Sequence, residues 1–235
     1  MTLTDIKHSW RDEESYHKEI HESFIEKVNA DPFLKEYRDW IEQNVFGFGE
    51  RSFLWLWKLI VDEMPSEFSF IELGVFRGQI LAFIKALASA TGRKVARFGV
   101  TPLDTSGDMW ESDYAKDIST LHHHFFIPED YQLYIGSSSN TDIINKAKNT
   151  APYNICYIDG DHSYHGCLSD LQNYAPLVKQ GGYLVIDDAC TDMSQPWGFF
   201  QGIEDVTRAT LEYLSGREEW EFYGNVVHLR VYKRV

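Results

Sequence analysis

Two clusters of charged side chains carry most of the chemistry that this sequence offers. Asp159, Asp161 and His162 follow one short apolar run, and Asp187 with Asp188 follows another. Short apolar runs closed by polar residues predict buried strands of a parallel sheet. The carboxyl ends of such strands share one edge of the sheet, where α/β proteins bind ligands. Four carboxylates gathered there repel one another unless a cation or a proton compensates, so we predict a divalent-metal site and an enzyme.

A turn with two glycines precedes these clusters and offers a second binding feature. Gly74 and Gly78 stand between an apolar run that ends at Glu72-Leu73 and a stretch with helical spacing. Gly74 lets the backbone bend and a ligand approach, and Gly78 lets the helix begin close to the sheet. The free N–H groups at the start of that helix favour an anionic or polar ligand group. The turn differs from the G-x-G-x-x-G dinucleotide fingerprint, because Phe76 stands where the second glycine belongs.

The elements that position these residues alternate between strand and helix from about residue 68. The predicted strands span residues 68–73, 95–100, 131–135, 154–158, 182–186, 221–223 and 226–232. Helices are predicted near residues 80–90, 113–126, 141–148, 164–175 and 201–215. This alternation predicts an α/β fold with a doubly wound, Rossmann-like sheet of seven mostly parallel strands. The last two strands are too close for a helical crossover, so an antiparallel terminal strand is expected, with a turn at Gly224-Asn225.

Residues 1–64 are predicted to form a helical N-terminal extension, and residues 65–235 the domain that carries the chemistry. Apolar residues spaced four apart predict one amphipathic helix; they are Tyr16, Ile20, Phe24 and Val28. Asp31-Pro32 predicts the start of another helix, with Asp31 as its cap. The extension is expected to cover the substrate or to form a homo-oligomer, and simple packing on the sheet is the alternative.

Bulk properties exclude several classes of partner and location. The chain has 235 residues and a formal net charge of −14, without any basic run. An acidic surface disfavours nucleic acids and anionic membranes, so neither is expected as a partner. Three cysteines without C-x-x-C spacing fit neither a disulfide framework nor a zinc knuckle. With no apolar leader and no apolar helix of membrane-spanning length, a cytoplasmic protein is expected.

The glycine turn and the acid clusters together resemble a known family. Glu72-x-Gly74-x-x-x-Gly78 is similar to the first motif of class I S-adenosylmethionine-dependent methyltransferases, where an acid and glycines hold the amino acid part of the cofactor. Residues 158–164 and 181–188 resemble one branch of that family, the metal-dependent O-methyltransferases related to macrocin, mycinamicin and novobiocin sugar-modifying enzymes.

That resemblance implies S-adenosylmethionine and Mg²⁺ as cofactors, and a small hydroxylated substrate such as a sugar or a natural-product scaffold. It implies that Asp159, Asp187 and Asp188 ligate the cation, in agreement with the preference of Mg²⁺ for carboxylate oxygens. A substrate hydroxyl bound to the metal becomes more acidic, and Asp161 or His162 would remove its proton. We favour Asp161 as the base and keep His162 as its competitor. In the alternative without catalysis, Asp161 caps the next helix and His162 packs.

The cofactor-binding residues that the resemblance implies lie on several separate segments. They are Glu72, Gly74, Phe76, Gly78, Asp104, Gly136, Ser137, Ser138 and Asp159. Two positions depart from the family pattern. Thr101 stands where members carry an acid for the ribose hydroxyls, which leaves Asp104 as the nearest acid. Ser137 replaces the acid of the turn beside the adenine.

Two other classes of function stay open from the residues. A nicotinamide-dependent oxidoreductase also uses a Rossmann-like sheet, although the G-x-G-x-x-G fingerprint is missing. A non-catalytic cofactor-binding protein of the same fold is the other class, and the intact set of acids argues against it.

Elsewhere, His122, His123 and His124 point in different directions on a helix, which predicts a solvated or partly packed face and not a metal site. For Asp192 two roles are expected as alternatives: a further ligand of the metal, or an acid in a loop that is exposed to solvent.

Overall fold

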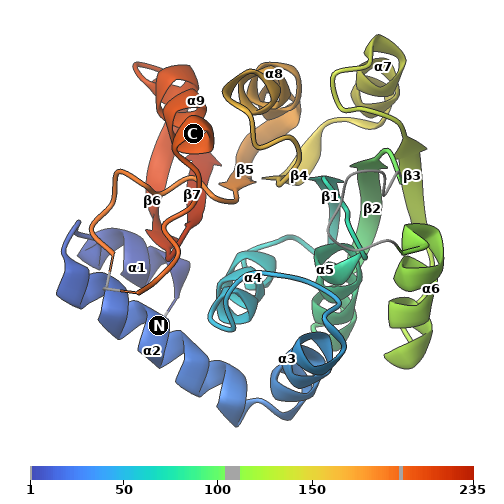
Figure 1. Ribbon diagram of the computed structural model, residues 1–235, viewed down its shortest axis with the longest axis horizontal. Helices are drawn as coiled ribbons and strands as arrows, with labels where there is room; N and C mark the ends of the chain where they lie inside the picture. Colours follow the sequence, from blue (N-terminus) through green and yellow to red (C-terminus); the bar gives the residue numbers. More distant parts are fainter. Residues whose placement is uncertain (1, 104–111, 196–197) are drawn as a thin grey trace.

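The structure, a computed structural model, describes residues 2–103, 112–195 and 198–235. Within these residues the chain forms a seven-stranded sheet in the order β3-β2-β1-β4-β5-β7-β6 (Figure 1). The first five of these strands pair in parallel, and β7 runs antiparallel to both β5 and β6. The expected mostly parallel sheet with an antiparallel terminal strand is therefore confirmed. The strands are β1 Glu67–Leu73, β2 Lys94–Thr101, β3 Tyr131–Ile135, β4 Tyr153–Ile158, β5 Val178–Ile186, β6 Trp220–Val226 and β7 Leu229–Arg234.

Helices cover both faces of the sheet, so the fold is doubly wound (Figure 1). The helices α7, α8 and α9 lie on one face, and α1 to α6 lie on the other (Figure 1). Each face buries its own apolar cluster, as expected for a sheet sandwiched between two helical layers. The helices are α1 Leu3–Ser9, α2 Glu14–Ala30, α3 Pro32–Asn44, α4 Phe53–Asp62, α5 Gln79–Ala90, α6 Tyr114–His124, α7 Thr141–Thr150, α8 Tyr164–Tyr174 with the 3₁₀ turn Ala175–Leu177, and α9 Glu204–Leu214.

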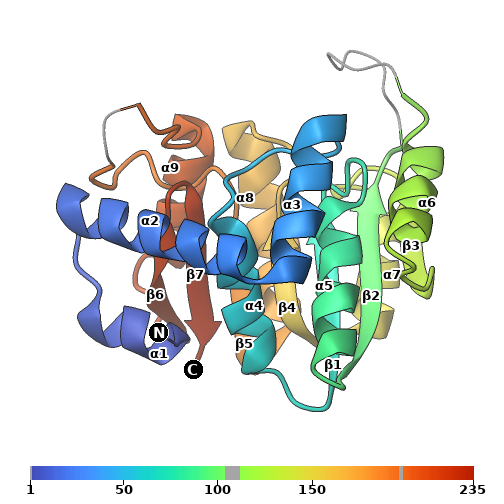
Figure 2. The same ribbon diagram turned by 90° about the horizontal axis from the view of Figure 1, so that it is seen from below.

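The N-terminal helices share one core with the sheet. The four apolar residues that predicted α2 are all buried in it. Asp31 caps α3 as expected, because its carboxylate accepts hydrogen bonds from the amides of Phe33 and Leu34. Trp57 of α4 is fully buried and contacts the rings of Phe70 and Tyr157 in the sheet edge-on. Figure 2 shows α2, α3 and α4 lying across this face of the strands.

The turn between the last two strands differs from the expectation. The predicted turn at Gly224-Asn225 is wrong, because β6 continues to Val226 and the chain reverses at Val227-His228. Gly224 instead lies where the register of the two strands shifts, with φ of +124°. A Cβ atom there would lie 2.6 Å from a ring carbon of Trp10, so the glycine marks a bulge that admits this ring.

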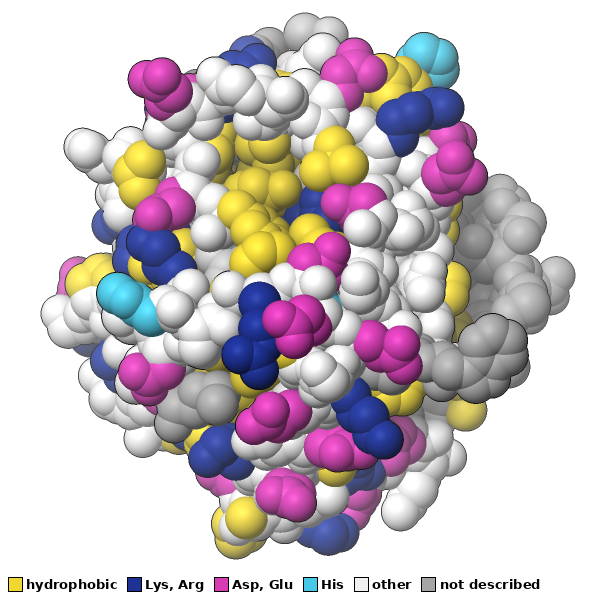
Figure 3. All heavy atoms as spheres, turned by 90° about the vertical axis from the view of Figure 1, so that its left-hand side faces the viewer, with side chains coloured by type: hydrophobic (Ala, Val, Ile, Leu, Met, Phe, Trp, Pro, Cys, Tyr) yellow, Lys and Arg dark blue, Asp and Glu magenta, His cyan; other side chains and the backbone are white. Residues whose placement is uncertain are grey.

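The side of the molecule at β6, the outer edge of the sheet, carries both charged and apolar side chains. Figure 3 shows acidic and basic side chains interspersed around an exposed apolar strip on this side of the molecule. Lys7 of α1 forms an ion pair with Glu221 of β6, which ties the first helix to the edge strand.

No helix in the described part of the chain is long and apolar enough to cross a membrane.

Candidate active site

A cavity of about 650 Å³ opens where the carboxyl ends of the parallel strands meet. Its lining comes from segments that follow five different strands, including the glycine turn after β1 and the acid loop after β4. Most of the predicted site residues line it: Glu72, Gly74, Phe76, Gly136, Ser137, Ser138, Asp159, Asp161, His162 and Asp187. Gly78 and Asp188 lie beside this lining and are not part of it. Asp104 lies outside the described residues.

The glycine turn after β1 adopts a backbone that few other residues tolerate. Gly74, Phe76 and Gly78 all have positive φ, at +87°, +47° and +82°. A Cβ atom on Gly74 would lie 1.8 Å from the backbone oxygen of Asp159, so this glycine lets the turn pass directly under the acid loop. A Cβ atom on Gly78 would lie 3.0 Å from Ile118 of α6. This glycine therefore makes room for α6, whereas we expected it to let the helix begin close to the sheet.

Glu72 at the end of β1 is a buried carboxylate with a free acceptor. Its side chain is 2% exposed and faces the cavity. Within the described residues, its Oε2 atom has no hydrogen-bond partner. Burial, and then the charge of Asp159, hold the pKa of Glu72 well above its usual range. A buried acceptor without a partner is costly, so this position suits a polar group of a bound ligand.

The two acid clusters meet at the end of β4, where one tyrosine joins them. The Tyr157 hydroxyl lies 2.7 Å from Asp187 Oδ2 and 3.2 Å from Asp159 Oδ2, so it can donate to either carboxylate. His162 Nε2 lies 3.3 Å from Asp159 Oδ1 and 3.7 Å from Asp188 Oδ2. Sequence reasoning did not find Tyr157, because β4 is buried along its whole length and gives no alternation to mark the residue that faces the site.

The compact group of potential metal ligands consists of Asp187, Asp188 and His228, with one atom from each within 4.8 Å of the others. His228 belongs to the β6–β7 turn and was missed, since nothing in the sequence links this turn to β5. A backbone hydrogen bond joins the two segments, because Ala189 N donates to His228 O. In the described residues Asp159 is not a member of this group and lies beside it, joined through Tyr157 and His162.

The crowding of acids shifts the pKa values of three side chains at the acid clusters. Burial, and then the charge of Asp187, raise the pKa of Asp159 to about 6. The same two causes raise the pKa of Asp188 to about 6. The hydrogen bond with Asp159 raises the pKa of His162 to about 9. These shifts have the sign expected of carboxylates that share a site and attract positive charge into it.

Asp161 has a structural contact as well as a place on the cavity wall. Its Oδ1 atom accepts a hydrogen bond from Ser163 N at 2.9 Å, just before α8 begins. A Cβ atom on Gly166 would lie 2.3 Å from Asp161 Cγ. The glycine therefore leaves room on α8 for this carboxyl group. The helix cap itself is Ser163, whose hydroxyl accepts from Gly166 N.

The far side of the cavity is formed by the ends of β2 and β3. Thr101 is buried, and its hydroxyl accepts a hydrogen bond from Leu103 N. Gly136 has φ of +148°, and Ser137 and Ser138 follow it with Ser137 exposed. The Ser138 carbonyl accepts from the buried Tyr174, which fixes this turn against α8.

Two residue groups outside the cavity lie in different surroundings, and the three histidines form the partly packed face that was expected. His122 is fully buried and contacts Arg97, whereas His123 is exposed and His124 stacks on Trp40. Asp192 forms an ion pair at 2.5 Å with a buried arginine, Arg230, so it is neither a solvated loop acid nor part of the ligand group.

Similar sequences place the chain in a family. A family model described as a methyltransferase domain matches residues 71–189, just over half of the chain. An uncharacterized protein from Acanthamoeba polyphaga mimivirus is 26% identical over 155 residues. That match covers 63% of this chain and 64% of the viral protein, so it spans less than two thirds of the relative.

Solved structures of low sequence identity share the fold. A putative caffeoyl-CoA O-methyltransferase from Staphylococcus aureus has a TM-score of 0.60 and 13% identity, covering 94% of this chain and 98% of that chain. MycE, a methyltransferase from the mycinamycin biosynthetic pathway solved with Mg and SAH, has a TM-score of 0.56 and 16% identity. The match covers 85% of this chain and 52% of that chain. The family match, over more than half of the chain, shows that this chain belongs to the methyltransferase domain family.

Proposed function

We propose that this protein transfers the methyl group of S-adenosylmethionine to a hydroxyl group of a small molecule, with a divalent cation bound at the acid clusters. One observation carries this proposal: a single cavity of about 650 Å³ is lined both by the glycine turn with Glu72 and by the acid loop with Asp159. A cavity of this size suits small ligands, and it brings a donor site and an acid cluster together.

The cofactor fits the end of the cavity formed by the glycine turn. Glu72 offers a buried acceptor that has no partner in the described part of the chain, which suits a hydroxyl or ammonium group of the cofactor. Gly74, Phe76 and Gly78 shape the turn, and Gly136, Ser137 and Ser138 form the opposite wall. S-adenosylmethionine supplies a methyl group that is already activated, so the protein's task there is to hold it in line with the acceptor oxygen.

A cation fits the other end of the cavity. Asp187 and Asp188, with Asp159 beside them, form a buried group of negative charge whose repulsion a cation relieves. MycE, which shares the fold, was solved with Mg and SAH. A bound divalent cation would lower the pKa of an acceptor hydroxyl and orient it. Within this arrangement the carboxylates would position the cation, and the Tyr157 hydroxyl can donate to Asp187 or to Asp159.

Asp161 and His162 are the two proposed acceptors of the hydroxyl proton. Both line the cavity, and they make different contacts. Asp161 is held by the backbone of Ser163, whereas His162 contacts the carboxylates of Asp159 and Asp188. Replacing each in turn, as Asp161→Asn and His162→Gln, distinguishes them, because removal of the base lowers the rate by about 10²- to 10⁴-fold while cofactor affinity stays intact.

An apolar wall on the cavity indicates the character of the acceptor. The rings of Phe48, Phe76 and Tyr114 form a continuous series, with centroids 5.4 Å and 5.0 Å apart. All three line the cavity together with Phe53. We therefore propose an acceptor that carries its hydroxyl groups on a ring or another apolar scaffold, which can stack on this wall.

The test of this function is calorimetric titration with S-adenosylhomocysteine, with and without a divalent cation. We expect binding to the wild type, and we expect added cation to support turnover of hydroxylated acceptors in a screen that follows S-adenosylhomocysteine release. With Asp188→Asn, added cation should no longer support turnover. Asp142→Asn, at an exposed acid of α7, should behave as the wild type. Binding of NADH without binding of S-adenosylhomocysteine would replace this proposal with the oxidoreductase.

A further inference from the structure

His228 is a buried histidine whose ring faces the acid pair from a different part of the chain. It lies in the turn between β6 and β7, and its side chain is 5% exposed. The ring is held edge-on between Phe53 and Phe200, with centroid distances of 4.8 Å and 5.1 Å. This packing fixes the plane of the imidazole, so the direction of its two nitrogen atoms is set by the fold.

Within the described residues this ring makes one hydrogen bond, and the neutral tautomer that makes it has Nε2 as an acceptor. Nδ1 lies 3.3 Å from the backbone oxygen of Phe200 and acts as the donor, because a carbonyl oxygen can only accept. Nε2 lies 3.5 Å from Asp187 Oδ1 and 3.8 Å from Asp188 Oδ1, beyond the usual range of an N–H···O hydrogen bond. Within the described residues, Nε2 therefore points at two carboxylates without a hydrogen bond to either.

The spacing of these three atoms suits a shared cation. Metal ions that bind imidazole and carboxylate at about 2.0–2.2 Å place neighbouring ligand atoms about 3.0–3.5 Å apart. Nε2 of His228 and the two aspartate oxygens all lie within 4.8 Å of one another, so a small inward movement brings them to that spacing. A hydrogen bond from Nδ1 to a backbone oxygen is also how metal-bound histidines are usually oriented.

The chemistry of the donor atoms decides which cation this group prefers. Mg²⁺ is bound through oxygen and holds its waters strongly, so it gains little from an imidazole. First-row transition ions gain affinity from an imidazole nitrogen. A group of two carboxylates and one imidazole therefore discriminates against Mg²⁺, in contrast to the all-carboxylate set that the sequence predicted.

We propose that His228 Nε2 is a ligand of the cation at Asp187 and Asp188, and that this nitrogen makes the centre prefer a first-row transition ion, with Mn²⁺ as the probe, over Mg²⁺. The assignment deepens the function proposed above and rests on it for the role of the cation in methyl transfer. The binding of the cation itself is tested without any acceptor substrate.

The direct test is pulsed electron paramagnetic resonance of the wild-type protein loaded with one equivalent of Mn²⁺. We expect electron spin-echo modulation from a coordinated ¹⁴N nucleus, and its replacement by a ¹⁵N pattern in protein labelled with ¹⁵N-histidine. Absence of nitrogen modulation in the loaded wild type would overturn the proposal. This measurement needs no variant, so it decides the question even where a substitution at His228 prevents folding.

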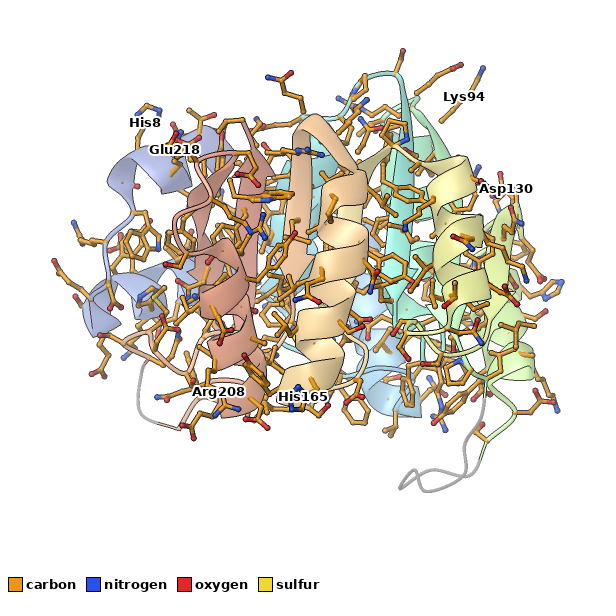
Figure 4. The ribbon with its side chains drawn as sticks, turned by 90° about the horizontal axis from the view of Figure 1, so that it is seen from above. His8, Lys94, Asp130, His165, Arg208 and Glu218 are labelled. Atoms are coloured by element: carbon orange, nitrogen blue, oxygen red, sulfur yellow. The ribbon has the colours of Figure 1, made fainter. Side chains whose placement is uncertain are left out.

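Variants then assign the nitrogen to a residue. His228→Gln should abolish the nitrogen modulation and lower the Mn²⁺ affinity by about tenfold or more, with little change in Mg²⁺ affinity. His8→Gln is the matched control, because His8 is exposed and lies at the edge of the molecule opposite His165 and the start of α8 (Figure 4). Modulation that survives in His228→Gln and vanishes in His162→Gln would assign the ligand to His162 and overturn the proposal.

The test of the His228 ligand and the test of the proposed methyl transfer can succeed or fail independently. Titration with S-adenosylhomocysteine reports on the donor site, and nitrogen modulation reports on the cation site. A wild type that shows nitrogen modulation without binding S-adenosylhomocysteine would end the proposed function and keep His228 as a ligand. A wild type that binds S-adenosylhomocysteine and shows only water around Mn²⁺ would keep the function and end the ligand assignment.

Discussion

At the scale of single residues, the site gathers acids that repel one another and a buried acid with an oxygen atom left over. Within the described residues, Glu72 Oε2 has no hydrogen-bond partner, and Asp159 and Asp188 each have a pKa raised to about 6. Such groups destabilise the empty protein and gain from a ligand of opposite character. The same residues therefore weaken the fold slightly and prepare it to bind a cofactor and a cation.

The orphan oxygen of Glu72 leads to a prediction for the cofactor site. Replacing Glu72 with glutamine keeps the shape of the side chain and removes its ability to ionise when a cationic group binds. We expect the affinity for S-adenosylhomocysteine to fall by about 1.5–3 kcal/mol, the usual value of a hydrogen bond to a charged group. The free energy of unfolding of the empty protein should stay the same or rise, because a buried carboxylate is lost.

Calorimetry and urea unfolding measure the two quantities on the same preparation. Glu67→Gln is the control, because this residue begins the same strand at an exposed position. Equal affinity for S-adenosylhomocysteine in Glu72→Gln and the wild type would remove Glu72 from the cofactor site.

At the scale of elements, a buried polar pair joins β2 to α6. Arg97 of β2 is 1% exposed, and its Nη1 atom donates to Leu81 O and lies 2.9 Å from His122 Nε2. His122 Nδ1 lies 2.7 Å from Ile118 O and donates to it, so Nε2 accepts from the arginine. This arrangement requires a neutral imidazole, and burial lowers the pKa of His122 to about 4.

The lowered pKa of His122 predicts a loss of stability on mild acidification. The unfolded chain takes up a proton near pH 6.5, and the folded protein does so only near pH 4. Stability from this group is therefore complete above pH 6.5 and is lost as the pH falls from 6.5 to 4. Between pH 7 and pH 5 the loss should be about 2 kcal/mol.

Urea unfolding at pH 7, 6 and 5 measures this contribution. His122→Gln should be less stable than the wild type at pH 7 and should show a shallower dependence on pH. His123→Gln changes an exposed neighbour on the same helix and should keep the wild-type dependence. Parallel pH curves for the wild type and His122→Gln would show that His122 does not titrate as described.

At the scale of the whole molecule, the N-terminal helices connect directly to the chemistry. Trp57 of α4 contacts the ring of Tyr157, whose hydroxyl lies within hydrogen-bond distance of Asp159 and Asp187. Phe53 from the same helix lines the cavity and packs against His228. We therefore propose that residues 1–64 and 65–235 fold as one cooperative unit, with the extension acting as a wall of the site.

This proposal predicts the behaviour of a core substitution in the extension. Trp57→Ala should lower the free energy of unfolding by about 3–5 kcal/mol, because Trp57 is fully buried between the extension and the sheet. Unfolding followed by far-ultraviolet circular dichroism and by S-adenosylhomocysteine release should give one coincident transition. Trp40→Ala, at a partly buried tryptophan of α3, should cost less. Two separate transitions would show that the extension folds independently.

Much of the fold was predictable because its signals are local. The apolar runs that became β1, β4 and the end of β5 are buried on both faces, which makes each run continuous and easy to recognise. The turn at Val227-His228 was not predictable, because Gly224 carries the stronger turn signal and serves a bulge that Trp10 fills. That ring comes from the other end of the chain, so no local pattern near Gly224 reveals it.

The sequence by itself determined which strand ends carry acids, because a carboxylate that closes a buried strand must lie at the edge of the sheet. It also determined the glycine turn, whose backbone angles exclude most side chains. Only the tertiary structure decided that Tyr157 joins the two acid clusters and that His228 completes a ligand group with Asp187 and Asp188. The physical reason is that strand pairing and core packing, which act between distant segments, place these atoms within a few ångströms of one another.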